Sequence, residues 1–379
     1  DGFTVVHTWD VAAAMAYEDG YKSNDKVPMG GMQLGCAFVQ GDIPVTVSYN
    51  GKIAILPSRN AADSKNIQFL CGHRSYISSF AINYSDGVIY TGDSDGTICM
   101  WDLFSGDSIS YVQRSKDGDE CFDDTLMNKV HTGAITGMVF VEGKLLSIGW
   151  DDKLRTIKEN TAQNSIPLEA QPNKIGRGLS LVVIITVNGL LLLKDNAIIS
   201  DMIQTPYEPL CVCISNNDKT VYIGGNDFNV HVYDVDGNCL NKIKTLDGSH
   251  TRPIHALSLS NDETKLASAD VRDVYIWNVA EEYAPLIGRS RWCFHQQKIN
   301  ALSWSNDDTI LASCSNDDSI YLWSLKKKMT RIHYAFSHRG GVCGMEFLKN
   351  DSGMILLTVG SDGCVNRWDV ADDVKKKFG

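Results

Sequence analysis

The chain has 379 residues, 43% of them hydrophobic, and a formal net charge of -11 at pH 7. This composition supports large buried cores and excludes a mainly disordered chain. The acidic balance argues against a general nucleic-acid binder, which presents a basic stripe to phosphates.

The amino-terminal stretch 1–10 lacks the basic and then apolar regions of a signal peptide and begins in the middle of a repeat-like pattern. We therefore expect the chain to be a fragment, or to lack residues ahead of Asp1. The longest apolar run, Leu179 to Leu193, is interrupted by Asn188-Gly189, which predicts two buried strands joined by a turn and no membrane span.

The 11 cysteines are scattered, and only Cys211 and Cys213 have a short spacing. Alternation along a strand puts these two on the same face, which is typical of reduced core thiols. We expect no metal site, no cofactor and a cytoplasmic location.

One phrase recurs along the chain with a spacing of roughly 40 to 45 residues. Its last copy predicts a hairpin, because Ser361-Asp362-Gly363 is a tight-turn sequence between two runs of strand formers. In chain order the copies follow a strand fragment at 3–11 and occupy 33–56, 72–102, 131–157, 175–194, 207–234, 250–278, 295–324 and 338–369. The first copy is degenerate, with Asn50-Gly51 in its turn, and the region 105–129 departs from the period.

Three copies hold a histidine, a hydroxyl residue, an aspartate and a tryptophan in one register. We expect each set to form a buried chain of hydrogen bonds, since an orphaned buried group costs about 1–3 kcal/mol. A catalytic His-Asp-Ser site is the alternative, which the repetition disfavours. The sets are His73, Thr91, Asp95 and Trp101; His295, Ser313, Asp317 and Trp323; and His338, Thr358, Asp362 and Trp368.

Units of this length with Gly-His and Trp-Asp signatures resemble WD repeats, which predicts an all-β propeller of four-stranded blades with very little helix. The resemblance extends to the order of the copies. The segments "PMGGMQLGCAFVQGD", "GHRSYISSFAI", "HTGAITGMVF", "YEPLCVCIS" and "FHQQKINALSWSNDDTILASCSNDDSIYLWSL" are similar to the carboxy-terminal half of the actin-interacting protein 1 (WD-repeat protein 1) family.

That resemblance implies a chain without enzymatic activity that binds actin filaments and, with cofilin, promotes their disassembly. It further implies two tandem seven-bladed propellers in the whole protein, and a monomer at the actin cytoskeleton with no nucleic-acid or membrane partner. We expect residues 1–65 to end a preceding propeller, 66–370 to form a seven-bladed propeller and 371–379 to be a tail. A closed eight-bladed ring is the alternative.

Propellers bind partners mainly through the loops entering each blade and the turns beside them. Trp150 precedes a turn aspartate where other copies have small residues, so it is either an exposed interface anchor or a ring filling the gap left by Ile157. The basic members would face an acidic partner, unless they are scattered surface charges. The candidate rim comprises Arg74, Tyr76, Trp150, Asn226, Phe228, Arg252, Gln297, Lys298, Asn316 and Arg339.

The sequence also allows other functional roles. The acidic stretch 105–129 is a solvated connection or a docking loop. A general scaffold that docks an unrelated peptide across the propeller face is the alternative function. An enzyme is disfavoured, because no glycine-rich phosphate loop and no nucleophile–base pair stands outside the repeats.

Overall fold

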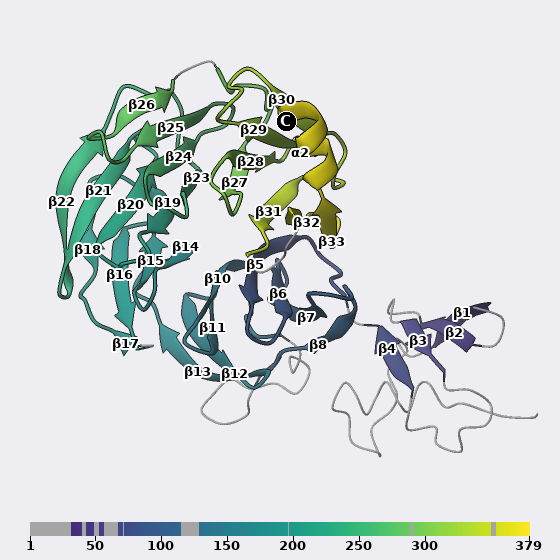
Figure 1. Cartoon of the computed structure of the whole chain (residues 1–379). Coiled ribbons are helices and arrows are strands. Elements are labelled where there is room, and N and C mark those ends of the chain that lie inside the picture. The colour runs from purple at the N-terminus through teal and green to yellow at the C-terminus, as the bar shows by residue number, and fades with distance from the viewer. Residues whose placement is uncertain are drawn as a thin grey trace, which may run out of the picture.

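The computed structural model describes residues 32–39, 43–48, 53–56, 67–70, 72–114, 129–195, 197–288, 291–349 and 354–379. The strands in this part of the chain form eight sheets, and the regular helix described is short. Figure 1 shows one sheet, at the amino-terminal end, beside a ring formed by the other seven. The predicted all-β propeller architecture is confirmed.

The sheet beside the ring has the order β1-β2-β3-β4. Its last strand pairs with β3 through Ile53 and Leu70, although the sequence had assigned residues from 66 onward to the ring. The reason is that the outer strand of one repeat directly precedes the next repeat's histidine in the chain. The strands are β1 (Gln33–Val39), β2 (Ile43–Ser48), β3 (Ile53–Ile55) and β4 (Gln68–Leu70).

We number the ring sheets 1 to 7 in chain order; the first strand of each is innermost in Figure 1. Sheet 1 is β5 (Ile77–Asn83), β6 (Val88–Asp93), β7 (Ile98–Asp102) and β8 (Ser108–Tyr111). Sheet 2 is β10 (Ile135–Val141), β11 (Lys144–Gly149), β12 (Lys153–Lys158) and β13 (Thr161–Pro167), extended by β9 (Gln113–Arg114) in parallel. Sheet 3 is β14 (Pro172–Arg177), β15 (Val182–Thr186), β16 (Gly189–Lys194), β17 (Ala197–Ile198) and β18 (Ile203–Gln204).

The remaining sheets follow the same plan. Sheet 4 is β19 (Pro209–Ile214), β20 (Thr220–Gly225), β21 (Val230–Asp236) and β22 (Cys239–Leu246). Sheet 5 is β23 (Ala256–Leu259), β24 (Lys265–Ala269), β25 (Val274–Asn278) and β26 (Ala284–Ile287). Sheet 6 is β27 (Ile299–Trp304), β28 (Ile310–Ser315), β29 (Ile320–Ser324) and β30 (Arg331–Tyr334). Sheet 7 is β31 (Val342–Phe347), β32 (Ile355–Gly360) and β33 (Val365–Asp369), followed by α2 (Ala371–Phe378), where the sequence predicted only a tail.

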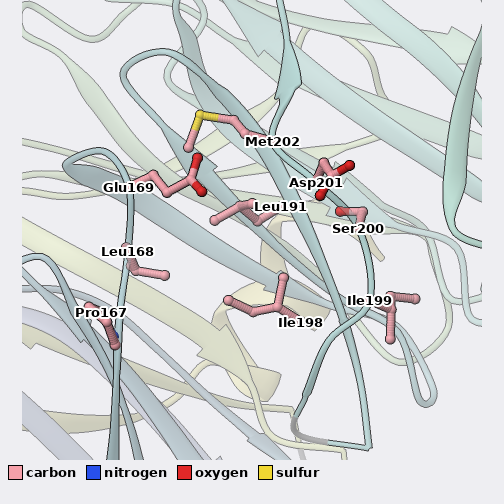
Figure 2. A pocket seen from close by; sticks show the side chains of 9 residues that line it. All are labelled: Pro167, Leu168, Glu169, Leu191, Ile198, Ile199, Ser200, Asp201 and Met202. Atoms are coloured by element: carbon pink, nitrogen blue, oxygen red, sulfur yellow. The ribbon is translucent and has the colours of Figure 1, made fainter.

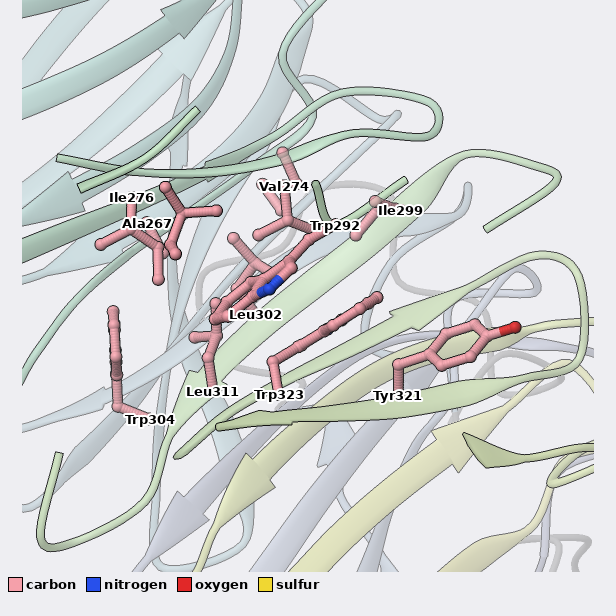
Figure 3. Packing of buried hydrophobic residues seen from close by; sticks show 13 residues of the cluster. Ala267, Val274, Ile276, Trp292, Ile299, Leu302, Trp304, Leu311, Tyr321 and Trp323 are labelled. Carbon is pink, nitrogen blue, oxygen red and sulfur yellow. The ribbon is translucent and has the colours of Figure 1, made fainter. Parts of the chain in front are cut away.

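The hydrophobic core lies between successive sheets, so inner strands are buried on both faces. The apolar run predicted to give two strands forms β15 and β16, and both have five consecutive buried residues. Figure 3 shows the cluster between sheets 5 and 6, where the rings of Trp292 and Trp323 stack 5.1 Å apart. The Trp292 indole also donates a hydrogen bond to the Lys328 carbonyl at 2.9 Å, so its polar atom is satisfied.

The ring closes where sheet 7 meets sheet 1. Apolar residues of both sheets share one buried cluster, which includes Ile82, Ile89, Leu348 and Leu357. The Tyr84 hydroxyl of sheet 1 donates a hydrogen bond to Glu346 of sheet 7 at 2.9 Å. Closure in the described part of the chain therefore rests on side-chain packing between first and last sheets.

A repeated polar network ties the end of each sheet together. In sheets 1, 2, 5, 6 and 7 a buried histidine places Nδ1 2.7 to 3.0 Å from an aspartate and Nε2 2.7 to 2.8 Å from a Ser or Thr hydroxyl. Sequence analysis found the network in three copies. His131 and His250, in two further copies, have the same kinds of partner: Asp151 and Ser147 for the first, and Asp270 and Ser268 for the second.

One member of the predicted network is wrong. His73 bonds Asp93, at 2.9 Å, and not Asp95, which is exposed and whose backbone N–H donates to Asp93. The two aspartates flank Ser94, and Asp93 ends strand β6, where its carboxylate reaches the histidine. Asp95 lies two residues further along the chain, in the turn, and is exposed to solvent.

One order of donors and acceptors satisfies the network with a single proton on the imidazole. In sheet 7 the Trp368 indole donates to the Thr358 hydroxyl at 2.9 Å, which leaves that hydroxyl to donate to His338 Nε2. His338 Nδ1–H then donates to Asp362. Every buried polar atom is satisfied without a second imidazole proton.

Sheets 3 and 4 replace the network. In sheet 4 the hydroxyls of Tyr207 and Tyr233 lie 2.7 Å apart, and His231 stacks on the Tyr207 ring at 3.8 Å. In sheet 3 the Thr186 hydroxyl donates to the Gly189 carbonyl of the following turn at 3.1 Å, and the surrounding residues are apolar. The same His231 also has Nε2 3.0 Å from the turn aspartate Asp227, so sheet 4 keeps an aspartate–histidine bond with the histidine supplied by β21. In sheet 3 apolar packing and a local hydrogen bond take the place of the network.

We expect Thr358→Val to lower the free energy of unfolding by about 1–3 kcal/mol, because it leaves the Trp368 indole and the His338 ring without their shared partner. Urea denaturation followed by fluorescence measures the change. The control is Thr251→Val, at an exposed residue. Equal stability of the two variants would show that the network does not hold the sheet together.

We also expect acid to destabilise the chain from about pH 6.5 downward. Burial lowers the pKa of His131 below its ordinary value, so the folded state resists a proton that the unfolded state accepts. Stability is therefore lost as the pH falls below the unfolded-state pKa. Denaturation over a pH series tests this, and His131→Gln should show a shallower loss than wild type; identical pH profiles would contradict the explanation.

Candidate interaction face

One backbone hydrogen bond recurs at the same end of five sheets. The N–H of the residue before the turn donates to a carbonyl of the loop that enters the sheet, at 2.9 to 3.2 Å. The bond aligns these positions in a single register, so their side chains belong to one face of the ring. The pairs are Ser94 and Tyr76, Trp150 and Ala134, Asn226 and Glu208, Asn316 and Lys298, and Ser361 and Gly341.

The network aspartates hold the loops of this face in place. Asp362 accepts a hydrogen bond from the backbone N–H of Arg339 at 3.1 Å, and Asp317 accepts one from Gln296 at 2.8 Å. Burial raises the pKa of the Asp362 carboxyl, but the hydrogen bonds from His338 and from backbone N–H groups outweigh that effect and lower it. The carboxylate therefore stays ionised near neutral pH and anchors the first residue after the histidine.

Three aromatic side chains of the predicted rim are exposed. Trp150 is 57% exposed, Tyr76 is 47% exposed and Phe228 is 41% exposed. Phe228 also has a φ of 70°, which is unusual for a non-glycine residue. These rings lie on sheets 2, 1 and 4.

Trp150 does not fill the gap left by the missing tryptophan of sheet 2. Ile157 occupies the tryptophan position and is only 3% exposed within an apolar cluster. Trp150 itself lies over Gly133, where an added Cβ would approach the Trp150 Cβ to 3.2 Å. The ring is therefore available as an anchor, while Gly133 leaves room beside it.

The basic residues of the rim form an arc over consecutive sheets. Arg252 of sheet 5, Arg339 of sheet 7 and Arg74 of sheet 1 are all exposed. Lys298 of sheet 6 is also exposed, and it directly precedes β27, the innermost strand of its sheet in Figure 1. The arc ends beside Tyr76 and Trp150.

The two rim amides are engaged within the protein. Asn226 accepts a hydrogen bond from the Glu208 N–H at 3.1 Å, and Asn316 accepts one from Asn300 at 2.6 Å. Their oxygen atoms therefore shape the loops. Gln297 is exposed, and its carbonyl accepts from the Ser315 hydroxyl at 2.9 Å.

The acidic connection lies largely outside the described residues, which omit 115–128 and with them all five of its acidic residues between 117 and 124. The carboxy-terminal lysines, Lys375 to Lys377, lie in the last turn of α2. That helix is joined to sheet 6 by a hydrogen bond from the Tyr334 hydroxyl to Asp373 at 2.7 Å.

A pocket of about 410 Å³ lies between the outer strand of sheet 2 and sheet 3 (Figure 2). It forms because β17 and β18 both pair with β16 and the chain bulges between them. Leu191, Ile198 and Met202 line it together with the carboxylates of Glu169 and Asp201. The lining offers no nucleophile paired with a base.

The described residues hold no group of three or more His, Cys, Asp or Glu side chains arranged to bind a metal. Cys211 is buried and Cys213 is half-buried; both are free thiols, and burial raises the pKa of each, to about 12 and about 11. Among the same residues, no helix has the length and apolar character needed to cross a membrane.

Comparison with known proteins agrees with the repeat architecture. The family model "WD domain, G-beta repeat" matches residues 64–102 and 289–324. The computationally designed Ika8 protein, at 18% sequence identity, aligns with a TM-score of 0.57 over 89% of this chain and 96% of its own, which is a likeness of fold alone.

Curated relatives match almost the whole chain. WD repeat-containing protein 1-A of Xenopus laevis is 31% identical over 374 residues, covering 96% of this chain and 57% of its own length. Actin-interacting protein 1 of Caenorhabditis elegans is 28% identical over 96% of this chain and 56% of its own. The 66 kDa stress protein of Physarum polycephalum is 26% identical with the same two coverages.

The chain thus spans a little over half the length of these relatives. Its repeats, its repeated buried network and its alignment agree with one another. The chain is a WD-repeat β-propeller protein, homologous over 96% of its length to WD repeat-containing protein 1 and actin-interacting protein 1.

Proposed function

We propose that this chain is a non-enzymatic actin-binding module that acts with cofilin to promote disassembly and turnover of actin filaments. The observation that carries the proposal is the collinear similarity to proteins named actin-interacting protein 1, from Caenorhabditis elegans and Drosophila melanogaster. The similarity covers 96% and 89% of this chain.

The ring then corresponds to a carboxy-terminal propeller, and the β1–β4 sheet to the end of a preceding one. This assignment rests on the resemblance of the repeat segments to the carboxy-terminal half of the family, and a chain that spans 56% of the Caenorhabditis elegans protein has the length that it requires. Actin filaments and cofilin are the proposed partners of a monomeric chain located at the cytoplasmic actin cytoskeleton. The free thiols of the described residues suit a reducing compartment.

The exposed arc of Arg74, Arg252 and Arg339 supports the face as the contact surface. Basic side chains gathered along one arc of the ring attract an acidic partner and raise its association rate. Tyr76 and Trp150 adjoin the arc and offer aromatic area of the kind that anchors protein interfaces.

We expect the double variant Arg74→Glu/Arg339→Glu to weaken binding to cofilin-decorated filaments by about tenfold or more, because it reverses two charges on adjacent sheets. The readout is the concentration of chain needed for half-maximal loss of filament fluorescence. Lys375→Glu/Lys377→Glu on α2 makes the same change of charge elsewhere and serves as control. The proposal fails if the two double variants behave alike, or if the wild-type chain leaves decorated filaments unchanged at saturation.

A general scaffold function is the second candidate, and the exposure of Trp150 favours it. Trp150→Ala distinguishes the two roles. If the face docks an unrelated peptide, the variant loses a captured peptide while actin filaments are bound by neither form. If it contacts actin with cofilin, the variant weakens filament binding.

A further inference from the structure

The inner strands of the ring share a bulge, and one of them breaks its pattern. In six sheets the register of the first strand shifts between its first residue and a residue two positions later. In five of these the second residue is small: Ser79, Gly137, Cys211, Ala301 or Gly344. In sheet 3 it is Lys174.

The small residue is explained by the next sheet of the ring. An added Cβ at Gly137 would lie 2.7 Å from the Ile175 side chain of sheet 3, and one at Gly344 would lie 2.6 Å from the Phe80 ring of sheet 1. A long cationic side chain at this position therefore departs from the packing rule that the other sheets follow.

The Lys174 side chain contacts sheet 5, which lies beyond sheet 4, the next sheet of the ring. Its Nζ donates a hydrogen bond to the carbonyl of His255 at 3.2 Å. His255 directly precedes β23 of sheet 5, so the lysine passes the whole of sheet 4. Only one of the three donors of the ammonium is used in this contact.

Two further cationic or protonatable groups lie at the same end of the inner strands. Lys298 directly precedes β27, and the N–H of the next residue, Ile299, donates a hydrogen bond to the Asp270 carbonyl at 3.4 Å. The His255 N–H donates to the carbonyl of the preceding residue, Ala269, at 2.9 Å, so Lys298 and the Lys174 contact at His255 flank the same end of β24. Within the described residues, neither lysine has a carboxylate within ion-pair distance. We call Lys174, His255 and Lys298 the axial basic cluster.

Asp270, the acidic group whose charge acts on His255, already has hydrogen-bond partners. Asp270, which follows β24, lies 3.0 Å from His250 and accepts hydrogen bonds from the backbone N–H groups of Arg272 and Asp273. Burial first, and then the charges of Lys298 and Lys174, lower the pKa of His255 to about 4, against a smaller opposing effect of Asp270. The cluster carries like charges whose compensation would come from a bound anion.

We propose that the axial basic cluster binds a tetrahedral oxyanion of the phosphate class, as a free ion or as the phosphate of a phosphorylated ligand. The two ammonium groups supply charge-assisted donors from opposite arcs of the ring, and His255 adds a third donor when it is protonated. This site is independent of the proposed actin-related function and lies toward the ring axis from the arginines of the face.

Isothermal titration calorimetry with inorganic phosphate at low ionic strength tests the site. We expect one saturable site, weakened about tenfold in Lys298→Gln and in Lys174→Gln, since each removes one charge-assisted donor. The Lys298 backbone carbonyl accepts from the Asn316 N–H, a bond that a side-chain substitution leaves in place, and no hydrogen bond of the described residues involves the Lys298 ammonium, so the variant should fold as the wild type does. Lys194→Gln, an exposed lysine of the same sheet as Lys174, is the control and should leave affinity unchanged.

A second measurement distinguishes a specific anion site from nonspecific electrostatic attraction of anions to the lysines. Sulfate remains a dianion in mild acid, so histidine NMR can follow His255, assigned with His255→Gln, with and without sulfate. We expect sulfate to raise the pKa of His255 from about 4 toward its ordinary value, with a smaller rise in Lys298→Gln. A phosphoserine peptide that competes with phosphate would identify a carried phosphate as the ligand, and a peptide that does not would identify the free ion.

No saturable binding of phosphate by the wild-type chain would overturn the proposal. Binding that survives both Lys→Gln substitutions, or a His255 pKa that sulfate leaves unchanged, would do the same.

Discussion

The architecture depends on a buried aspartate–histidine hydrogen bond that is repeated at one end of five ring sheets. Each sheet hides both faces against its neighbours, so polar groups at its end must be satisfied inside the protein. The aspartate bonds both the buried histidine and a backbone N–H of the loop that enters the sheet. Asp362, for example, accepts hydrogen bonds from His338 and from the Arg339 N–H. Stability and the shape of the candidate face are thereby linked. Sheet 4 forms its aspartate–histidine bond with a histidine of β21, His231 to Asp227, and sheet 3, which has no such bond among the described residues, relies on apolar packing and a local hydroxyl contact.

Much of this architecture could be predicted, because it repeats. The periodic Gly-His and Trp-Asp signatures were sufficient for the all-β propeller, for the hairpins and for the histidine networks of three sheets. The errors arose where register decides between neighbouring residues. In Thr91-Gly-Asp-Ser-Asp95 two aspartates fit the spacing, and only the strand end at Asp93 selects the one that reaches His73. The sequence assigned β4 to the ring, because chain order does not reveal which strand it pairs with. The sequence did not predict a role for Lys174, because only the strand register shows that it occupies the bulge position that is small in other sheets.

Two kinds of position differ in how much they change from sheet to sheet: the buried network positions and the exposed positions next to them. Histidine, aspartate and hydroxyl positions recur from sheet to sheet, whereas the exposed positions beside them carry Trp150 on one sheet, an arginine on another and a serine on a third. Variation on a constant frame is what a binding surface requires. The arginine arc with its aromatic neighbours and the axial basic cluster are two such variations, one on the rim and one toward the axis, and substitutions can address them separately.

The most direct measurement is co-sedimentation of this chain with actin filaments, with and without cofilin, over a series of salt concentrations. The proposed function predicts that the chain sediments with filaments when cofilin is present, and that binding weakens as salt rises because exposed arginines contribute to it. A chain that stays in the supernatant under all of these conditions would contradict the assignment of actin binding to these sheets.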